Sequence, residues 1–490
     1  MGRRSLRSFA ALIGAITAGL FLIVTKLHFE SFGRLSVLLD RSSVLRSIVS
    51  ANPLIWCVLA LAAFGGIITV EGQFATVSVM LALAAILCLV AFDYGLQLLT
   101  SFPKTLASVV EYGECGWTRL FMPCLRDKSQ MALVQHSADI AIIVIALIAL
   151  PVILPQSRYW LVLLPITIFW LRSNALWQEV VHISSHTKFL TPRNKCERRV
   201  ARLGLTLLDR WCYWGTSQFF GMFPGWYDAE HIGIHHPEVN SQHDVESVVS
   251  LNRTSFIDFA YLTARLIANT TTGYGMYRYF WRRRVRAYFR MTVVGAVVHA
   301  LTILVASIIL PPLGVWLAIS SLGFSYSVAV IALSDHGMTD PDCPTDIYRN
   351  SYNVVWQFDD YGQYGNKSHL SHHLKPAPCW GHRAMASALQ DQEIGFGSRG
   401  AILFRGFAYP DDLFRAYWND DPDFLYPYVV SVGAVRPTPD EWRRIFTHRS
   451  RPPDARKSGA FTRRISSLAA RLATSHIPPS DGRAQISLGP

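Results

Sequence analysis

The chain contains 490 residues, of which 51% are hydrophobic and only 16% are charged. Soluble proteins usually carry ~25% charged residues, and several apolar runs here reach the ~20 residues that a helix needs to cross a bilayer. The composition therefore disfavours a set of soluble domains and predicts an all-α polytopic membrane protein. The net charge of +12 comes from 46 Lys and Arg against 34 Asp and Glu. No stretch resembles a nucleic-acid-binding module, so no nucleic-acid partner is expected.

Seven apolar runs are predicted to span the membrane: 8–24, 53–71, 75–100, 137–155, 158–173, 291–310 and 312–333. Tight turns join several of them into hairpins, and a hairpin returns the chain to the side that it left. The polar segments 172–290 and 334–490 should therefore share one face. They hold 16 and 18 of the 46 basic residues. Because Lys and Arg concentrate in cytoplasmic loops, this face is predicted to be cytoplasmic.

The orientation of the N-terminus stays open. Counting crossings places it outside, whereas Arg3, Arg4 and Arg7 favour the cytoplasm. A signal peptide is the alternative interpretation of the first run, but no clear cleavage site precedes Lys26.

Two histidine boxes follow the predicted span 158–173. In the first, His182 and His186 are four residues apart, so on a helix both imidazoles can face one metal ion. Alone this is a weak signal, since two polar residues at a helix end show the same pattern. The second box contains His231, His235 and His236. Its spacings of four and five residues suit two adjacent ions, and a solvated polar turn is the alternative.

A third box contains His369, His372 and His373, which share one face of a helix. A predicted hairpin separates it from the second box, so all three boxes lie on the same side of the membrane. Unrelated surface histidines would have no reason to be separated by an even number of membrane crossings. Their position on one side therefore predicts one shared site. His336, at the end of the last span, adds a ninth imidazole. A single histidine at a helix end is more often structural, but the topology favours a ligand.

The number of histidines says more about the metal than their type does. Neutral imidazole binds zinc, copper, iron and nickel. One zinc ion is usually satisfied by four ligands, so eight or nine histidines predict two ions. The zinc-protease motif H-E-x-x-H is absent, because Ile183 stands at the Glu position. Copper stays open on these grounds.

The three boxes resemble those of the integral-membrane non-haem di-iron family, which includes fatty acid desaturases and alkane hydroxylases. The resemblance implies that the family's iron ligands correspond to His182, His186, His231, His235, His236, His336, His369, His372 and His373. Polar side chains beside the boxes are candidates to orient these ligands, namely Glu230, Asp244, Asp335 and Asn366. For each of these four, a helix cap or a surface polar residue is an equally good interpretation.

The resemblance implies two iron ions, dioxygen as co-substrate, and a lipid or acyl substrate. Electrons would come from a separate ferredoxin, rubredoxin or cytochrome, since no fused carrier motif is visible. The predicted function is a fatty acid desaturase-type oxidation of C–H bonds in a long acyl chain. Acyl desaturases typically have two residues between the first histidines of the second box, whereas three separate His231 from His235. This spacing is closer to the alkane-hydroxylase branch, so hydroxylation is the alternative.

A metal transporter is a third hypothesis. Transporters place polar ligands near the bilayer midplane, often on broken helices in repeated halves. Here the boxes lie outside the apolar runs, which favours an enzyme. His299, inside the run 291–310, is predicted to be a hydrogen-bonded core residue rather than a ligand.

These inferences divide the chain into four regions. Residues 1–136 form a membrane region outside the resemblance, and 137–380 form the catalytic domain. A cytoplasmic extension follows over 381–449. Residues 450–490 are expected to form a disordered basic tail, because they lack the apolar content of a core. The whole is predicted to be a multi-pass membrane protein with its active site on the cytoplasmic face.

Overall fold

The structure is a computed structural model, and it describes residues 117–126, 131–153, 162–193, 198–355, 369–374, 396–405 and 411–451. The predicted spans 8–24, 53–71 and 75–100, the side chain of Asn366 and the tail beyond residue 451 lie outside the described residues. The described part is mostly helical, as predicted.

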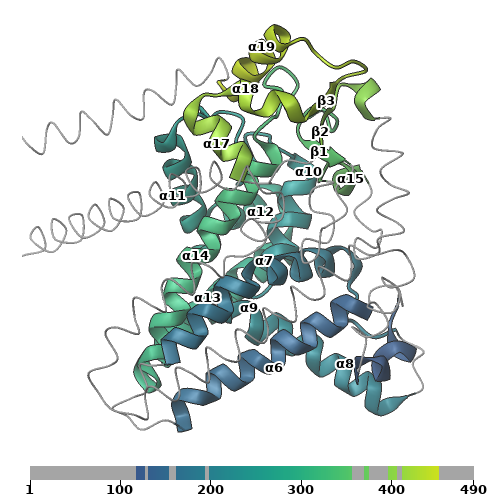
Figure 1. Ribbon diagram of the computed structural model, residues 1–490. Coiled ribbons are helices and arrows are strands. Elements are labelled where there is room, and N and C mark those ends of the chain that lie inside the picture. Colours follow the sequence, from purple (N-terminus) through teal and green to yellow (C-terminus); the bar gives the residue numbers. More distant parts are fainter. Residues whose placement is uncertain are drawn as a thin grey trace, which may run out of the picture.

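The α-helices are α6 Met131–Ile153, α7 Leu163–Thr187, α8 Arg199–Trp211, α9 Ser217–Phe219, α10 His236–Glu238, α11 Phe256–Thr272, α12 Tyr274–Arg283, α13 Arg286–Ile309, α14 Pro311–His336, α15 His369–Leu374, α17 Asp411–Asn419, α18 Pro422–Leu425 and α19 Pro439–Ser450. The described residues also form the π-helices η4 Cys212–Thr216 and η5 Asp228–His235. Their 3-10 helices are η1 Trp117–Cys124, η7 Gly397–Arg399 and η8 Tyr426–Tyr428. Figure 1 shows α17, α18 and α19 at one end of the molecule and α6 and α8 at the other.

Among the described residues, α13 and α14 are the two helices long and apolar enough to cross a membrane. They correspond to the predicted spans 291–310 and 312–333. Leu310 alone separates them, and α14 opens with proline, whose fixed φ suits the first turn of a helix. The outer face of α13 exposes a set of apolar side chains: Val293, Val294, Val297, Leu301, Leu304, Val305, Ile308 and Ile309. Such a face suits contact with lipid.

The predicted spans 137–155 and 158–173 overlap α6 and α7, although residues 154–161 lie outside the described part of the chain. Helix α6 has 23 residues and includes the apolar stretch Leu133–Ala149. Helix α7 starts apolar but continues through Gln178 and Glu179 into the first histidine box.

Helix α14 is the central packing element. It packs against α11, α13 and α7, and the short helix α9, far away in the sequence, also contacts it. At that contact Gly221 has φ +88°, and a Cβ there would lie 2.2 Å from the backbone oxygen of Ser320, so only glycine fits. Nearby, His299 Nδ1 lies 3.2 Å from Gln218 Oε1, and its Nε2 lies 2.9 Å from Ser321 Oγ. The prediction that His299 is a hydrogen-bonded core residue is confirmed.

The expectation of an all-α fold is wrong in one respect, because the chain also forms a three-stranded sheet. Strand β1 Tyr352–Val355 pairs in parallel with β2 Ile402–Arg405, which pairs antiparallel with β3 Val429–Val432. Asn353 of β1 accepts a hydrogen bond from the backbone N–H of Leu370, 2.9 Å away, through its Oδ1. The sheet thereby holds α15, which carries the third histidine box. Each strand has only four residues, too few for a periodic pattern to predict.

Candidate metal centre

All nine predicted histidines meet in one place. They come from the end of α7, from η5 and α10, from the last residue of α14, and from α15. Seven of them are buried, whereas His186 and His236 are half-buried. Their ring nitrogens form two adjacent groups, which we call cluster A and cluster B.

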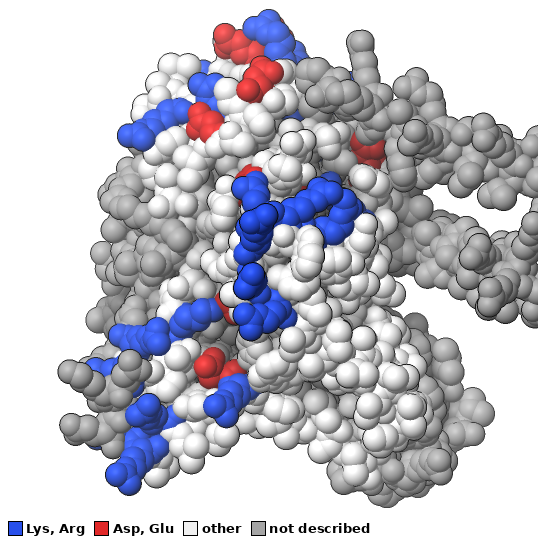
Figure 2. Space-filling view, turned by 180° about the vertical axis from the view of Figure 1, so that it is seen from behind, with Lys and Arg blue, Asp and Glu red and all other residues white. Residues whose placement is uncertain are grey.

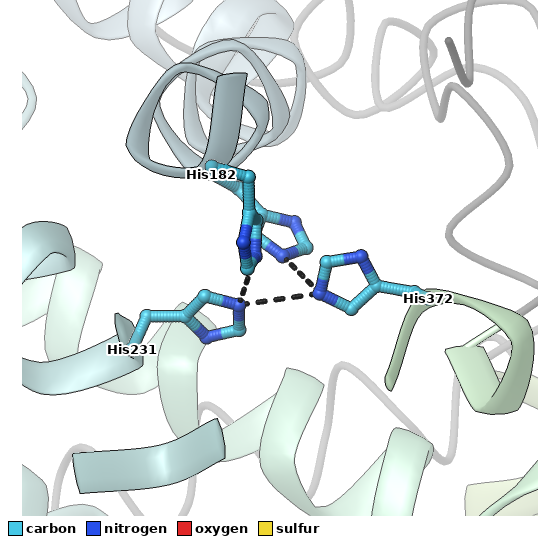
Figure 3. Close-up of side chains that lie close together, drawn as sticks. His182, His231 and His372 are labelled. Carbon is cyan, nitrogen blue, oxygen red and sulfur yellow. Dashed lines mark hydrogen bonds between the residues drawn. The ribbon is translucent and has the colours of Figure 1, made fainter. Parts of the chain in front are cut away.

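Cluster A consists of five imidazoles: His182, His186, His231, His236 and His372. The Nε2 atom of His372 lies 2.9 Å from that of His182, 3.1 Å from that of His236 and 3.3 Å from that of His231. The Nε2 atoms of His186 and His231 are 3.1 Å apart. Figure 3 shows His182, His231 and His372 pointing toward one another from three separate segments of the chain. The five Nε2 atoms therefore converge on one point.

Cluster B consists of four buried imidazoles: His235, His336, His369 and His373. The Nε2 atom of His336 lies 3.2 Å from that of His235 and 3.0 Å from that of His369. His369 and His373 bring their Nε2 atoms within 2.9 Å. The two clusters touch, since the rings of His236 and His373 are 4.7 Å apart.

The π-helical winding of η5 decides how the second box is shared. In a π-helix the backbone bonds join residues five apart, and the N–H of His236 donates to the carbonyl of His231. These two side chains therefore point the same way, into cluster A, while His235 points into cluster B. A regular α-helix would have paired His231 with His235. The third box is also divided, with His372 in cluster A and its two neighbours in the box, His369 and His373, in cluster B.

Polar groups occupy the second ring nitrogen of several histidines. Asp244 Oδ2 lies 3.0 Å from Nδ1 of His235, and Asp335 Oδ2 lies 3.2 Å from Nδ1 of His369. Such contacts orient the ring and leave Nε2 for a metal ion. The prediction placed both carboxylates beside a box, and the structure puts each against a histidine.

The other predicted carboxylate behaves differently. Glu230 is buried, and together with Glu246 and His235 it forms a third group whose possible ligand atoms lie within 4.8 Å of one another. Burial raises the pKa of Glu230 well above its usual range and that of Glu246 to about 7. The pair therefore carries fewer than two negative charges at neutral pH.

Two partners were missed by sequence reasoning. Glu179 Oε2 lies 3.3 Å from Nδ1 of His182. Its position three residues before His182 on one helix is a signal that spacing alone could have provided. The second is the backbone carbonyl of Asn350, 2.8 Å from Nδ1 of His336. No sequence pattern announces a carbonyl partner, because every residue has one.

Burial sets the charge of most of these imidazoles. It lowers the pKa of His231, His372 and His373 well below the usual range, and neighbouring histidines lower it further. For His236 the pKa falls to about 2. His235 is the exception: burial opposes its protonation, but the carboxylate of Asp244 outweighs burial and raises the pKa. A neutral imidazole is the form that binds metals, so most of the centre is in that form at neutral pH.

A cavity of about 30 Å³ lies between the clusters. Its walls include His182 and His231 from cluster A, His235 and His336 from cluster B, and Tyr227. One water molecule takes ~30 Å³ of liquid volume, so the cavity holds a water-sized molecule. Any small molecule placed there would contact both clusters at once.

The donor set fits a pair of transition-metal ions. The clusters could each hold an ion, and all of their donors are imidazole nitrogens. This set suits iron, copper, zinc and nickel better than magnesium or calcium, which prefer oxygen. Five imidazoles in cluster A exceed the four ligands that usually complete a zinc site. The centre therefore suits an ion of higher coordination number.

Comparison with known proteins gives no match: no family model, no curated protein and no solved structure matches the chain. The chemistry of the centre therefore has to be inferred from its own residues.

Proposed function

We propose that the protein is a membrane-bound di-iron oxidoreductase of the fatty acid desaturase type, which uses dioxygen to oxidise C–H bonds in a long acyl chain. The observation that supports this most directly is the pair of touching imidazole clusters with a water-sized cavity between them. Two iron ions held there would activate dioxygen, which is the oxidant that removes hydrogen from an unactivated C–H bond. The protein supplies the neutral imidazoles and the carboxylates that orient them.

The position of the clusters argues against metal transport. Cluster B contains the last residue of α14, His336, and cluster A contains His182 and His186 near the end of α7. Transport sites usually lie near the bilayer midplane on broken helices. The centre lies at helix ends instead, where a lipid chain, oxygen and a soluble partner can meet.

The hairpin of α13 and α14 supports one orientation in a membrane. If both helices cross it, the two ends of the hairpin, Arg286 and His336, lie on the same side. Basic residues on that side favour the cytoplasm by the rule for membrane loops. We therefore propose a multi-pass protein with the metal centre on the cytoplasmic face.

The same side carries a basic surface suited to an acidic electron donor. Exposed arginines of α12 and the start of α13 define what we call the α12 patch: Arg278, Arg282, Arg283, Arg284, Arg286 and Arg290. Basic side chains also form a band on the face shown in Figure 2. Arg283 donates a 2.6 Å hydrogen bond to Glu238, two residues from His236 of cluster A. An acidic ferredoxin, rubredoxin or cytochrome docked on the α12 patch would thus lie close to cluster A, because Glu238 links the patch to the segment that carries His236.

Hydroxylation of an alkyl or acyl chain is the second candidate, and one observation favours it. The three residues between His231 and His235, wound as a π-helix, set the second box apart from the spacing typical of acyl desaturases. Both outcomes use the same ligands, because each begins by removing hydrogen from carbon. They differ in whether a second hydrogen is removed or oxygen is returned.

Metal analysis followed by product analysis tests the proposal. The purified protein should contain two iron ions per chain, and with a reductant, oxygen and a long-chain acyl substrate it should form a new double bond. An alcohol would move the protein to the hydroxylase branch. Zinc or no metal, together with no oxygen consumption, would overturn the di-iron proposal and favour transport.

A further inference from the structure

A second, larger cavity lies against α7, and we call it the α7 cavity. Its volume is about 220 Å³, and the helix contributes Val181, Ser184 and Ser185 to its wall, with Lys188 directly after the helix. Ser184 and Ser185 stand between the first-box histidines in the sequence. The cavity is therefore next to the metal centre.

One side chain belongs to both cavities. Tyr227 lines the α7 cavity and also the small cavity between the clusters. Its ring centroid is 6.0 Å from that of His182 and 6.0 Å from that of His231. A molecule in the α7 cavity is thus separated from cluster A by little more than this ring.

Part of the wall is apolar and rigid. Trp177, Met222, Phe223 and Trp226 line it, and each is at most 1% exposed. Trp177 also stacks on Phe220 with ring centroids 5.6 Å apart. A hydrocarbon segment would find a preformed surface here.

The polar part of the wall has an uneven charge. Lys188 forms an ion pair with Asp228, so its charge is already engaged. Asp209 accepts a hydrogen bond from Thr191 at 3.3 Å and is a second carboxylate in the same wall. The lining residues therefore include two carboxylates, Asp209 and Asp228, but only one ammonium group, that of Lys188. Arg126, which is outside this wall, offsets the charge of Asp209 in part.

Burial in this wall disfavours a negative charge. Burial first, and then the charge of Asp228, raises the pKa of Tyr213 to about 12. Burial also raises the pKa of Asp209. A carboxylate or phosphate entering the cavity would meet the same desolvation cost and the same negative charge of Asp228, whereas the one lining ammonium group, Lys188, is already paired.

We infer that the α7 cavity binds the head of the substrate, and that this head donates hydrogen bonds, as a hydroxyl or ammonium group does, rather than being a free carboxylate or phosphate. The inference rests on the proposed function and names its substrate class: a long-chain lipid whose acyl group is held in an ester or amide rather than as a free acid. The cavity is smaller than the ~300–1,000 Å³ of usual small-molecule sites. It therefore takes the head and the adjoining carbons, with the rest of the chain outside it.

Direct binding to the purified protein tests this without any turnover. Three probes of equal length, short enough to lie wholly within the cavity, carry a terminal bromine and differ only in the head: an alkanol, an alkylamine and an alkanoate. Bromine quenches tryptophan fluorescence at contact, and Trp177 and Trp226 line the cavity. The alkanol and the alkylamine should each bind at least tenfold more tightly than the alkanoate. Equal or tighter binding of the alkanoate would overturn the inference.

Two variants, each with a matched control, test whether the probes bind in the α7 cavity. Asp209→Asn should improve alkanoate binding severalfold and leave alkanol binding nearly unchanged, whereas Asp423→Asn, on the exposed surface, should change neither. Met222→Trp fills the cavity and should abolish saturable quenching, whereas Val294→Trp on the outer face of α13 should not. Near-UV circular dichroism checks that each variant is folded. If alkanol binding survives in folded Met222→Trp, the site is elsewhere and the inference fails.

Iron content measured in the same sample separates this inference from the proposed function. Head-selective binding without iron would contradict the di-iron proposal alone. Two irons per chain with no head selectivity would contradict the inference alone.

Discussion

Clusters A and B use the same side chain but surround it differently. All four imidazoles of cluster B are buried, and three of them have a polar partner on Nδ1. Cluster A has five imidazoles, two of them half-buried, and Glu179 lies against Nδ1 of a buried member, His182. Nδ1 partners hold a ring in its binding orientation. The greater burial of cluster B indicates that it is the more preorganised site and that cluster A is the more adaptable one, closer to solvent and to the α7 cavity.

The largest expected effect comes from removing a ligand of cluster B. His235→Ala should abolish turnover and lower the iron content by at least one ion per chain, because no other described imidazole can replace it. Metal analysis and an oxygen-consumption assay measure both. His448→Ala is the matched control, since this histidine lies in α19, is 43% exposed and pairs with Asp342. Full activity in His235→Ala would remove this position from the site.

Removing an orienting carboxylate should weaken metal binding more in cluster B than in cluster A. Asp244→Asn should weaken metal binding or activity by ~10–100-fold, the usual cost of losing such a partner. Glu179→Gln in cluster A should cost less, because its contact with His182 is longer and lies nearer the surface. Metal titration of both variants decides this. Equal losses would show that the two clusters are equally preorganised.

As the pH falls, cluster B should lose its iron before cluster A does. A group with a raised pKa takes up its proton first as the pH falls, and His235 has a raised pKa beside Asp244. His236 in cluster A has a pKa of about 2 and stays neutral to much lower pH. Since protons compete with metal for imidazole, iron retained after dialysis at successively lower pH should fall in two steps. Loss of both ions in a single step would contradict the assignment.

The smallest effect is expected at the α12 patch. If electrons enter through cluster A, Arg278→Glu with Arg282→Glu should slow reduction by an acidic carrier about tenfold at low salt, and added salt should reduce the difference. Reduction by dithionite should be unchanged. Arg443→Glu with Arg444→Glu on α19 provides the control of equal charge. Slower reduction by dithionite would show damage to the centre rather than to docking.

The sequence by itself determined which side chains the centre contains. Box spacing is local, and a helix converts a separation of three or four residues into a shared face. His182 with His186, and His369 with His373, were therefore predictable, as were the apolar helices α13 and α14. Asp244 and Asp335 were also predictable as neighbours of a box. Glu179 was within reach of the same reasoning.

Only the tertiary structure decided how those side chains are divided. The assignment of His236 to cluster A and His235 to cluster B depends on the π-helical winding of η5, and the local sequence reads equally well as α-helix. The Asn350 carbonyl and the sheet that holds α15 depend on contacts between distant segments, such as β1 with β2. The α7 cavity joins residues of α7, α8 and the segment before η5. Spacing along the chain encodes the faces of one helix, whereas contacts between distant segments are decided by how those faces pack.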